Sequence, residues 1–174
     1  MLRDIVILIF RFTAYVLIQV LVLNNIQFSG YINPYPYILF VLTLPLWISP
    51  NLVLLLSFVL GLTIDVFSGT LGLHTFASVF TGFIRQGLLS LLKPNNDYKS
   101  EEISLQNLGF QWFLVYLSIG IFIHHLVLFT IESLSFTGFF HTLQVTVISA
   151  FFSIIIAFIF ELFRIKSKQE NILE

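Results

Sequence analysis

Long apolar runs recur along this chain at near-regular intervals, and most of them are long enough to cross a membrane. A helix needs about 20 apolar residues to span the hydrocarbon core of a bilayer. Hydrophobic residues make up 57% of the 174 positions, charged residues make up only 10%, and the mean hydropathy is +0.97. Because the runs do not alternate apolar with polar residues, they predict membrane helices rather than the strands of a barrel. The chain is therefore predicted to be an all-α integral membrane protein.

Six such runs predict about six transmembrane helices in one bundle. The second run is short, contains Pro45 and is followed by Pro50, so it forms either a tight helical hairpin with the third run or a thin, tilted span. All six belong to one membrane domain, residues 1–166, with a polar loop at 93–108 and a charged tail at 167–174. The runs cover residues 4–24, 37–49, 52–67, 71–92, 109–134 and 139–163.

Lysine and arginine are distributed unevenly over the loops that six spans would create. Short cytoplasmic loops carry an excess of these residues, so the distribution predicts the orientation. One side of the membrane receives six basic residues, and the other side, with the loops 25–36, 68–70 and 135–138, receives none. Both termini and the 93–108 loop are therefore predicted to be cytoplasmic. The six basic residues are Arg3, Lys93, Lys99, Arg164, Lys166 and Lys168.

The sequence lacks the patterns of several kinds of functional site. A formal net charge of −1 argues against a nucleic-acid partner, which would favour a basic patch. The chain has no cysteine, which excludes disulfides, thiolate metal sites and cysteine nucleophiles. His124 and His125 are adjacent, so on a helix they point about 100° apart and cannot bind one metal ion without other ligands. No phosphate-binding loop or nucleophile elbow is present. We therefore predict no enzymatic activity, no cofactor and no bound metal.

One aspartate, Asp65, lies with three glycines inside an otherwise apolar segment. Gly61, Asp65 and Gly69 are spaced four residues apart, so on a helix they share one face with Ser57. The result is a ridge of small and polar residues along which another helix can approach closely. The ridge is therefore a candidate for a specific helix contact or for a functional site.

The Asp65 carboxylate needs hydrogen-bond donors, because an aspartate side chain is too short to reach the membrane surface. The Ser68–Thr70 turn and the backbone amides of Leu71–Leu73, which open the next helix, are placed to supply them. In one interpretation Asp65 caps that helix and fixes the turn between the two spans. In the other interpretation it belongs to a site that binds a proton or a ligand. His74, one turn into the next helix, can join the cluster in either case.

A second small and polar face is predicted on the fourth run, where Gly82 follows Ser78 by four residues. This face can pack against the Asp65 ridge. Arg85 lies further along the same run, and Arg11 and Glu161 lie at a similar depth. These three charged groups either reach the interface with their long side chains or form a pair, Arg11–Glu161 or Arg85–Glu161, that ties two spans together.

An acidic turn between two spans of a small six-span protein resembles the corresponding turn of the rod shape-determining protein MreD family. The resemblance covers essentially the whole chain, but only the stretch from 61 to 74 is specific. Prolines and tyrosines before the second run and a proline kink within it support the resemblance. The residues concerned are Gly61-x-x-x-Asp65-x-x-x-Gly69-x-x-Gly72-x-His74, Asn33-Pro34-Tyr35-Pro36-Tyr37 and Leu44-Pro45-Leu46.

The resemblance implies a non-enzymatic membrane subunit of the bacterial cell-elongation (rod) complex, located in the cytoplasmic membrane. Members of that family support cell shape and sidewall peptidoglycan synthesis. They act beside MreC, with the MreB filament and with RodA and a class B penicillin-binding protein. The chain is thus expected to assemble with an MreC-like membrane protein by helix contacts. The candidate structural and interaction residues are Gly61, Asp65, Gly69, Gly72, His74, Gly82 and Arg85.

The same family is similar in fold to the substrate-binding subunits of energy-coupling-factor vitamin transporters, which supplies an alternative function. The chain would then be a small-molecule binding subunit of a membrane transporter. Such a subunit needs an outward-facing pocket with polar groups from several spans. The last two runs offer few polar groups beyond His124, His125 and Glu132.

Overall fold

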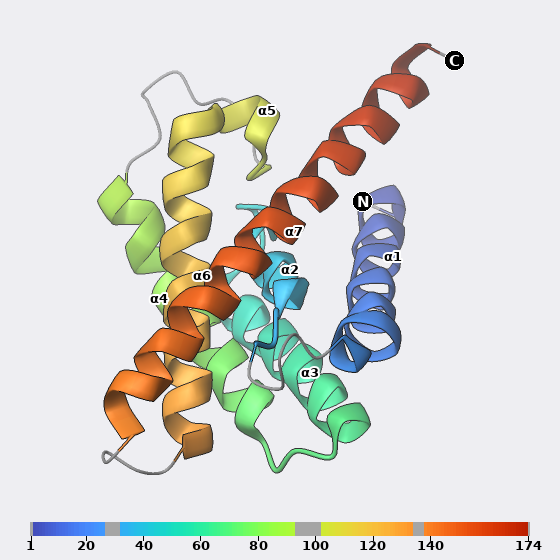
Figure 1. Ribbon diagram of the computed structural model, residues 1–174. Coiled ribbons are helices and arrows are strands. Elements are labelled where there is room, and N and C mark those ends of the chain that lie inside the picture. The colour runs from blue at the N-terminus through green and yellow to red at the C-terminus, as the bar shows by residue number, and fades with distance from the viewer. Residues whose placement is uncertain (1, 27–31, 93–101, 134–137, 174) are drawn as a thin grey trace.

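The computed structural model describes residues 2–26, 32–92, 102–133 and 138–173, and these residues form helices and connecting turns without a β-strand. Five helices in this part of the chain are long and apolar enough to cross a membrane, so the protein is a helical membrane bundle (Figure 1). The spanning segments are residues 2–25, 50–68, 73–92, 110–133 and 139–164. They correspond to α1 (Leu2–Leu17) with its continuation η1 (Ile18–Val22) and η2 (Leu23–Asn25), α3 (Pro50–Ser68), α4 (Leu73–Leu92), α6 (Phe110–Ser133) and α7 (Phe139–Leu173).

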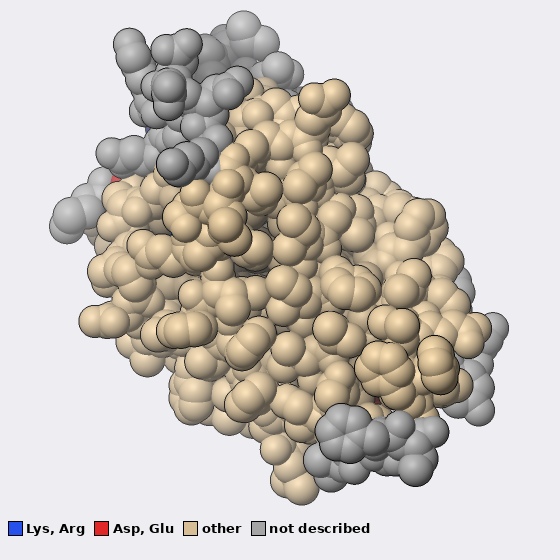
Figure 2. Space-filling model, turned by 90° about the vertical axis from the view of Figure 1, so that its left-hand side faces the viewer, with Lys and Arg blue, Asp and Glu red and all other residues tan. Residues whose placement is uncertain are grey.

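The sides of the bundle are apolar, as lipid contact requires. The face shown in Figure 2 is nearly free of charged side chains. Large hydrophobic side chains on different helices stand out from the bundle: Val66 of α3 is 71% exposed and Phe83 of α4 is 70% exposed. Apolar side chains in contact with hydrocarbon carry no solvation penalty, so these residues need no protein partner to be stable.

The two ends of the bundle differ in what they bring together. At one end lie both chain ends and the last residue of α4, Leu92, whose carbonyl oxygen accepts a hydrogen bond from Trp112 (3.1 Å; Figure 1). At the opposite end, here called the turn end, α1 and α3 both finish: the side-chain amide of Asn24 donates to Ser68 (2.9 Å). The α3–α4 turn and the end of α6 lie there too.

The second predicted span, 37–49, is not a spanning helix. It contains a 3-10 turn, η3 (Pro36–Ile38), and one short helix, α2 (Leu39–Leu42), and continues to Pro50 without regular structure. The prolines at 34, 36, 45 and 50 explain this outcome, because each removes a backbone donor and disfavours helix in the residue before it. Every residue from Tyr37 to Leu42 is at most 1% exposed, so the segment runs through the centre of the bundle.

This central segment, residues 33–44, still passes from the turn end toward the other end. Its first part lies beside Gln19, whose side-chain amide donates to the carbonyl of Pro34 (3.2 Å). Its last part lies beside Arg11, which donates to the Thr43 hydroxyl (2.5 Å). The segment therefore runs antiparallel to α1, and α3 ends beside the end of α1 at the turn end.

Arg85 of α4 has a different role from either of those predicted for it. It neither reaches the membrane surface nor pairs with Glu161: it is 5% exposed and donates to the backbone carbonyls of Leu42, at 3.4 Å, and Leu44. The Tyr116 hydroxyl of α6 donates to the Leu42 carbonyl as well (2.8 Å). Non-helical backbone at membrane depth is tolerated only where other protein groups form hydrogen bonds with its N–H and C=O groups. Arg85 and Tyr116 supply those groups where α2 ends.

The predicted Arg11–Glu161 pair is wrong too. Glu161 of α7 forms an ion pair with Arg164 (2.8 Å) and accepts a hydrogen bond from the backbone N–H of Leu105 (2.9 Å). It thereby anchors the short helix α5 (Leu105–Leu108) to α7. Of the predicted 93–108 loop, residues 93–101 lie outside the described residues. The predicted tail from 167 continues α7 as helical backbone to Leu173.

Candidate functional site

Asp65 connects the end of α3 to the start of α4. It is 3% exposed, and its two carboxylate oxygens accept four hydrogen bonds in all. One oxygen accepts from the Thr70 hydroxyl (2.5 Å) and the His74 backbone N–H (3.1 Å), and the other accepts from the backbone N–H (2.8 Å) and hydroxyl (2.5 Å) of Thr75. The His74 and Thr75 amides are among the unpaired donors of the first turn of α4. Asp65 therefore caps α4 from the preceding helix.

The capping interpretation of Asp65 thus agrees with the geometry, and Thr70 of the predicted Ser68–Thr70 turn does donate, but the other donors differ from those predicted. The amides lie at His74 and Thr75 rather than at Leu71–Leu73, and two threonine hydroxyls contribute. The difference arises because the turn is longer than a minimal one. Gly69 (φ +68°) ends α3 in the left-handed conformation, and Gly72 (φ +87°) turns the chain into α4. Both angles favour glycine, since a side chain there is strained.

The small faces of α3 and α4 meet closely, as the spacing predicted. A Cβ built on Gly61 would lie 2.4 Å from Thr75 Cα and 2.6 Å from the His74 carbonyl oxygen. A Cβ on Gly82 would lie 2.5 Å from the Ser57 hydroxyl oxygen. Glycine at 61 therefore lets the α4 backbone approach to the distance at which the Asp65 carboxylate can reach its amides.

A buried tyrosine joins this turn to α6. The Tyr37 hydroxyl, on the central segment, lies 2.9 Å from His74 Nδ1 and 2.9 Å from His124 Nε2. His124 Nδ1 lies 3.3 Å from the Thr81 hydroxyl, which donates to the Ala77 carbonyl (2.8 Å). Tyr37 and His124 are 0% exposed and His74 is 4% exposed. The result is a continuous hydrogen-bonded chain through three segments of the bundle.

The hydrogen bond from Thr81 to the Ala77 carbonyl, at one end of this chain, determines which group donates in each of the other bonds. The single hydroxyl proton of Thr81 goes to a carbonyl, so the Thr81 oxygen accepts from His124 Nδ1–H. His124 Nε2 is then an acceptor and takes the Tyr37 proton, so the Tyr37 oxygen accepts from His74 Nδ1–H. With neutral imidazoles, His74 Nε2 is left as an acceptor. No hydrogen bond within the described residues uses that nitrogen.

His125, next to His124, makes separate contacts. Its Nδ1 donates to the Ile121 carbonyl (2.9 Å), and its Nε2 faces the Ser153 hydroxyl of α7 (2.9 Å) and the backbone N–H of Tyr35 (3.4 Å). The two rings therefore serve different neighbours, in agreement with their spacing on a helix. Among the described residues, no group of three or more histidine, aspartate or glutamate side chains is arranged to hold a metal ion.

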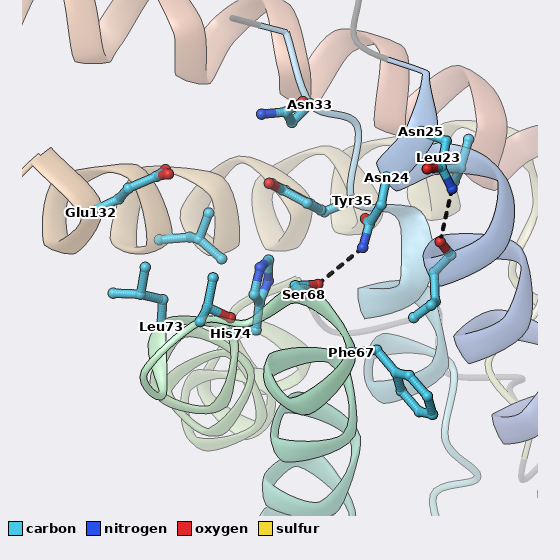
Figure 3. Close-up of a pocket in the computed structure, with 13 residues that line it drawn as sticks. Leu23, Asn24, Asn25, Asn33, Tyr35, Phe67, Ser68, Leu73, His74 and Glu132 are labelled. Carbon is cyan, nitrogen blue, oxygen red and sulfur yellow. Dashed lines mark hydrogen bonds between the residues drawn. The ribbon is translucent and has the colours of Figure 1, made fainter.

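A cavity of about 340 Å³ opens above this network at the turn end (Figure 3). Its polar groups come from α6, α4, the central segment and the ends of α1 and α3. Figure 3 shows the polar ends of Glu132 and Tyr35 pointing toward one another, with His74 beneath them. Burial raises the pKa of the Tyr35 phenol, so the hydroxyl keeps its proton. The polar lining residues are Asn24, Asn25, Asn33, Tyr35, Ser68, Thr70, His74 and Glu132.

Of the residues singled out in the sequence, Gly61, Asp65, Gly69, Gly72 and His74 converge on the turn, while Gly82 and Arg85 lie further along α4.

The sequence did not identify Tyr37 and Asn33 as site residues, because a tyrosine and an asparagine next to prolines also suit a membrane-surface loop. One signal for a buried partner such as Tyr37 was present: His124 lies in the middle of an apolar span, where a polar group needs a buried partner.

The fold and the turn define the chain as a polytopic helical membrane protein with a polar cavity at one end. No family model matches the chain, and no curated protein or solved structure matches it.

Proposed function

We propose that the chain is a non-enzymatic membrane subunit of the bacterial cell-elongation complex, which supports cell shape and sidewall peptidoglycan synthesis by assembling with other membrane proteins. The observation that supports this proposal is that residues of the 61–74 stretch, which carries the family resemblance, hold α3 and α4 together. The Asp65 carboxylate is engaged in capping α4, and Gly61 is engaged in close packing. Residues used in this way fix the shape of a helix pair.

In this proposal the α3–α4 pair is the rigid surface on which partner helices assemble. The bundle keeps the pair fixed through Asp65, and the pair presents exposed side chains such as Val66 and Phe83 to the bilayer. An MreC-like protein is the primary partner, with MreB, RodA and a class B penicillin-binding protein in the same assembly. No nucleic acid and no cofactor take part.

We expect the protein to lie in the cytoplasmic membrane with both termini in the cytoplasm, because six lysine and arginine residues fall on one side and none on the other. Reporters of cytoplasmic and periplasmic location, fused after Asn33, Asn96 and Glu174, measure the orientation. The fusions after Asn96 and Glu174 should report the cytoplasm and the fusion after Asn33 the periplasm. A periplasmic signal at Asn96 contradicts the orientation.

Replacing Asp65 by alanine should impair rod shape and reduce recovery of an MreC-like partner in pull-downs. The change removes the acceptor of four hydrogen bonds at membrane depth, where each unpaired group costs about 1–3 kcal/mol. Asp65→Asn keeps one oxygen and should be milder. Membrane abundance is measured together with cell shape and partner recovery.

The matched control for this experiment is Thr63→Ala, because the Thr63 hydroxyl bonds only to the Val59 carbonyl of its own helix (2.7 Å). This variant should behave as the wild type. If Asp65→Ala leaves abundance, partner recovery and rod shape unchanged, the turn is ordinary packing and has no part in assembly. If abundance holds while partner recovery falls, the turn belongs to the binding surface itself.

The cavity favours a second candidate, the small-molecule binding subunit of a transporter. A pocket with polar groups from several spans is the feature that such a subunit requires, and here α4, α6 and the central segment contribute. Purified protein tested for submicromolar binding of vitamins distinguishes the two functions, because the assembly proposal expects no such binding.

A further inference from the structure

The cavity at the turn end contains polar side chains with unused hydrogen-bonding capacity. The Asn33 side chain, the Tyr35 hydroxyl and the Glu132 carboxylate line it and form no hydrogen bond or ion pair with any other described residue. His74 lines it as well, is 4% exposed, and has its Nε2 free. Because His74 is buried, its free Nε2 is costly to leave unpaired, whereas Asn33 and Tyr35 are partly exposed and Glu132 is exposed, so these three can receive a group that enters from outside.

Each of the free groups can accept a hydrogen bond, and the Asn33 amide and the Tyr35 hydroxyl can also donate one. A glutamate carboxylate only accepts hydrogen bonds, and His74 Nε2 is an acceptor because Nδ1 carries the proton toward Tyr37. The Asn33 amide oxygen and the Tyr35 oxygen can accept too. The walls thus offer several acceptors at one place, and a ligand with several donors can use all of them.

The charge of the cavity has one sign. Glu132 carries the one carboxyl group among the described lining residues, no lysine or arginine accompanies it, and the basic residue His74 is neutral in the arrangement above. Asp65 lies behind the lining, with its carboxylate bonded to the amide of His74. An anionic group would therefore be repelled, whereas a cationic group would be attracted.

We propose that this cavity binds an alkylammonium or guanidinium group, held by the Glu132 carboxylate, His74 Nε2 and the oxygens of Asn33 and Tyr35. An ammonium group has three donors and no acceptor, and a guanidinium group has five donors, so both match the acceptor set. The group comes either from a lysine or arginine side chain of a partner polypeptide or from a free amine. The assignment needs neither of the two proposed functions to hold.

The absence of cysteine allows a direct test with single thiols in the purified full-length protein in lipid nanodiscs. Leu73→Cys places the thiol in the cavity wall. Leu71→Cys, at a position that is fully exposed, is the matched control outside the cavity. Each thiol is labelled with a cationic aminoethyl and an anionic sulfonatoethyl methanethiosulfonate, and the two rates are compared.

The ratio of cationic to anionic labelling should be about tenfold higher at Leu73→Cys than at Leu71→Cys, because a cavity lined by one sign of charge concentrates the opposite sign. Adding Glu132→Gln should reduce that ratio to the control value. Butylamine should slow labelling of Leu73→Cys by a neutral reagent, and 1-butanol should not. The proposal is wrong if the labelling ratio is the same at the two positions or does not change with Glu132→Gln. It is also wrong if butanol protects Leu73→Cys from the neutral reagent as well as butylamine does.

A comparison of native membranes with the purified protein then identifies the source of the cation. If Leu73→Cys is protected from the neutral reagent in native membranes and becomes reactive after purification, the group belongs to a partner's basic side chain. If it is equally reactive in both and only butylamine protects it, the ligand is a free amine. Because the charge-ratio measurement uses the purified chain alone, its result does not depend on whether the assembly proposal is correct.

Discussion

Replacing Gly61 by alanine is expected to destabilise the protein by about 3 kcal/mol or more, since the added methyl group collides with backbone rather than with a movable side chain. The new Cβ would lie 2.4 Å from Thr75 Cα and 2.6 Å from the carbonyl oxygen of His74. Relief requires α4 to move away from α3. That movement also lengthens the bonds from the His74 and Thr75 amides to Asp65. The free energy of unfolding in bicelles, measured by steric trapping, tests this expectation.

Two other glycines, Gly82 and Gly87 of α4, serve as controls for the measurement at Gly61 of α3. At Gly82 the added Cβ meets the Ser57 hydroxyl, a side-chain group that can rotate away, so the cost should be only about 1 kcal/mol. At Gly87 nothing lies within 4 Å, and alanine should stabilise the helix by up to about 1 kcal/mol. If Gly61→Ala is no worse than Gly82→Ala, the close contact of α3 and α4 is not a major source of stability.

The α3–α4 contact was predictable because its determinants are local in sequence. The four-residue spacing of Gly61, Asp65 and Gly69 places them on one helix face whatever the rest of the chain does. An aspartate that cannot reach the interface must find donors nearby, and the next helix offers unpaired amides. The choice of donors was less predictable, because it depends on the length of the turn that Gly69 and Gly72 form.

The central segment could not be predicted in the same way. Its prolines indicate that a regular helix is interrupted, but they do not say whether the interruption lies at the membrane surface or in the bundle. The answer depends on partners far along the chain: His124 and Tyr116 of α6 bond to Tyr37 and Leu42. The role of Arg85 could not be predicted for the same reason. Its partners are backbone carbonyl groups, which every residue has, so the sequence does not mark them.

These long-range contacts also explain how the cavity is built. Prolines 34 and 36 keep residues 33–35 out of a helix, so that Asn33 and Tyr35 face the space between α4 and α6. The hydrogen bond of the Tyr35 backbone N–H to Ser153 (2.8 Å) fixes that stretch on α7. Asn33 and Tyr35, two of the four polar groups proposed to hold a cation, therefore face the cavity because prolines keep this stretch of the chain out of a helix.

Replacing Arg85 by methionine is expected to destabilise the protein by about 2–3 kcal/mol, because the Leu44 carbonyl loses its charged donor in the centre of the bundle. Methionine has a similar length and no donor, so it isolates the hydrogen bonds from the packing. Arg85→Lys should be intermediate, since an ammonium group does not reproduce the planar fork of donors. Gln86→Met is the matched control, because Gln86 is the next residue on α4 and is exposed. The same steric-trapping assay measures all three variants.

The combination of Arg85→Met with Tyr116→Phe should destabilise the protein by more than the sum of the two single changes. Arg85 and Tyr116 both donate to the Leu42 carbonyl, so either one alone leaves that oxygen with a partner, whereas removing both leaves it unpaired at membrane depth. We expect an interaction energy of about 1 kcal/mol or more in a double-mutant cycle. Strict additivity would mean that the Leu42 carbonyl does not depend on these two donors, and the account of how the bundle tolerates its broken central segment would then be wrong.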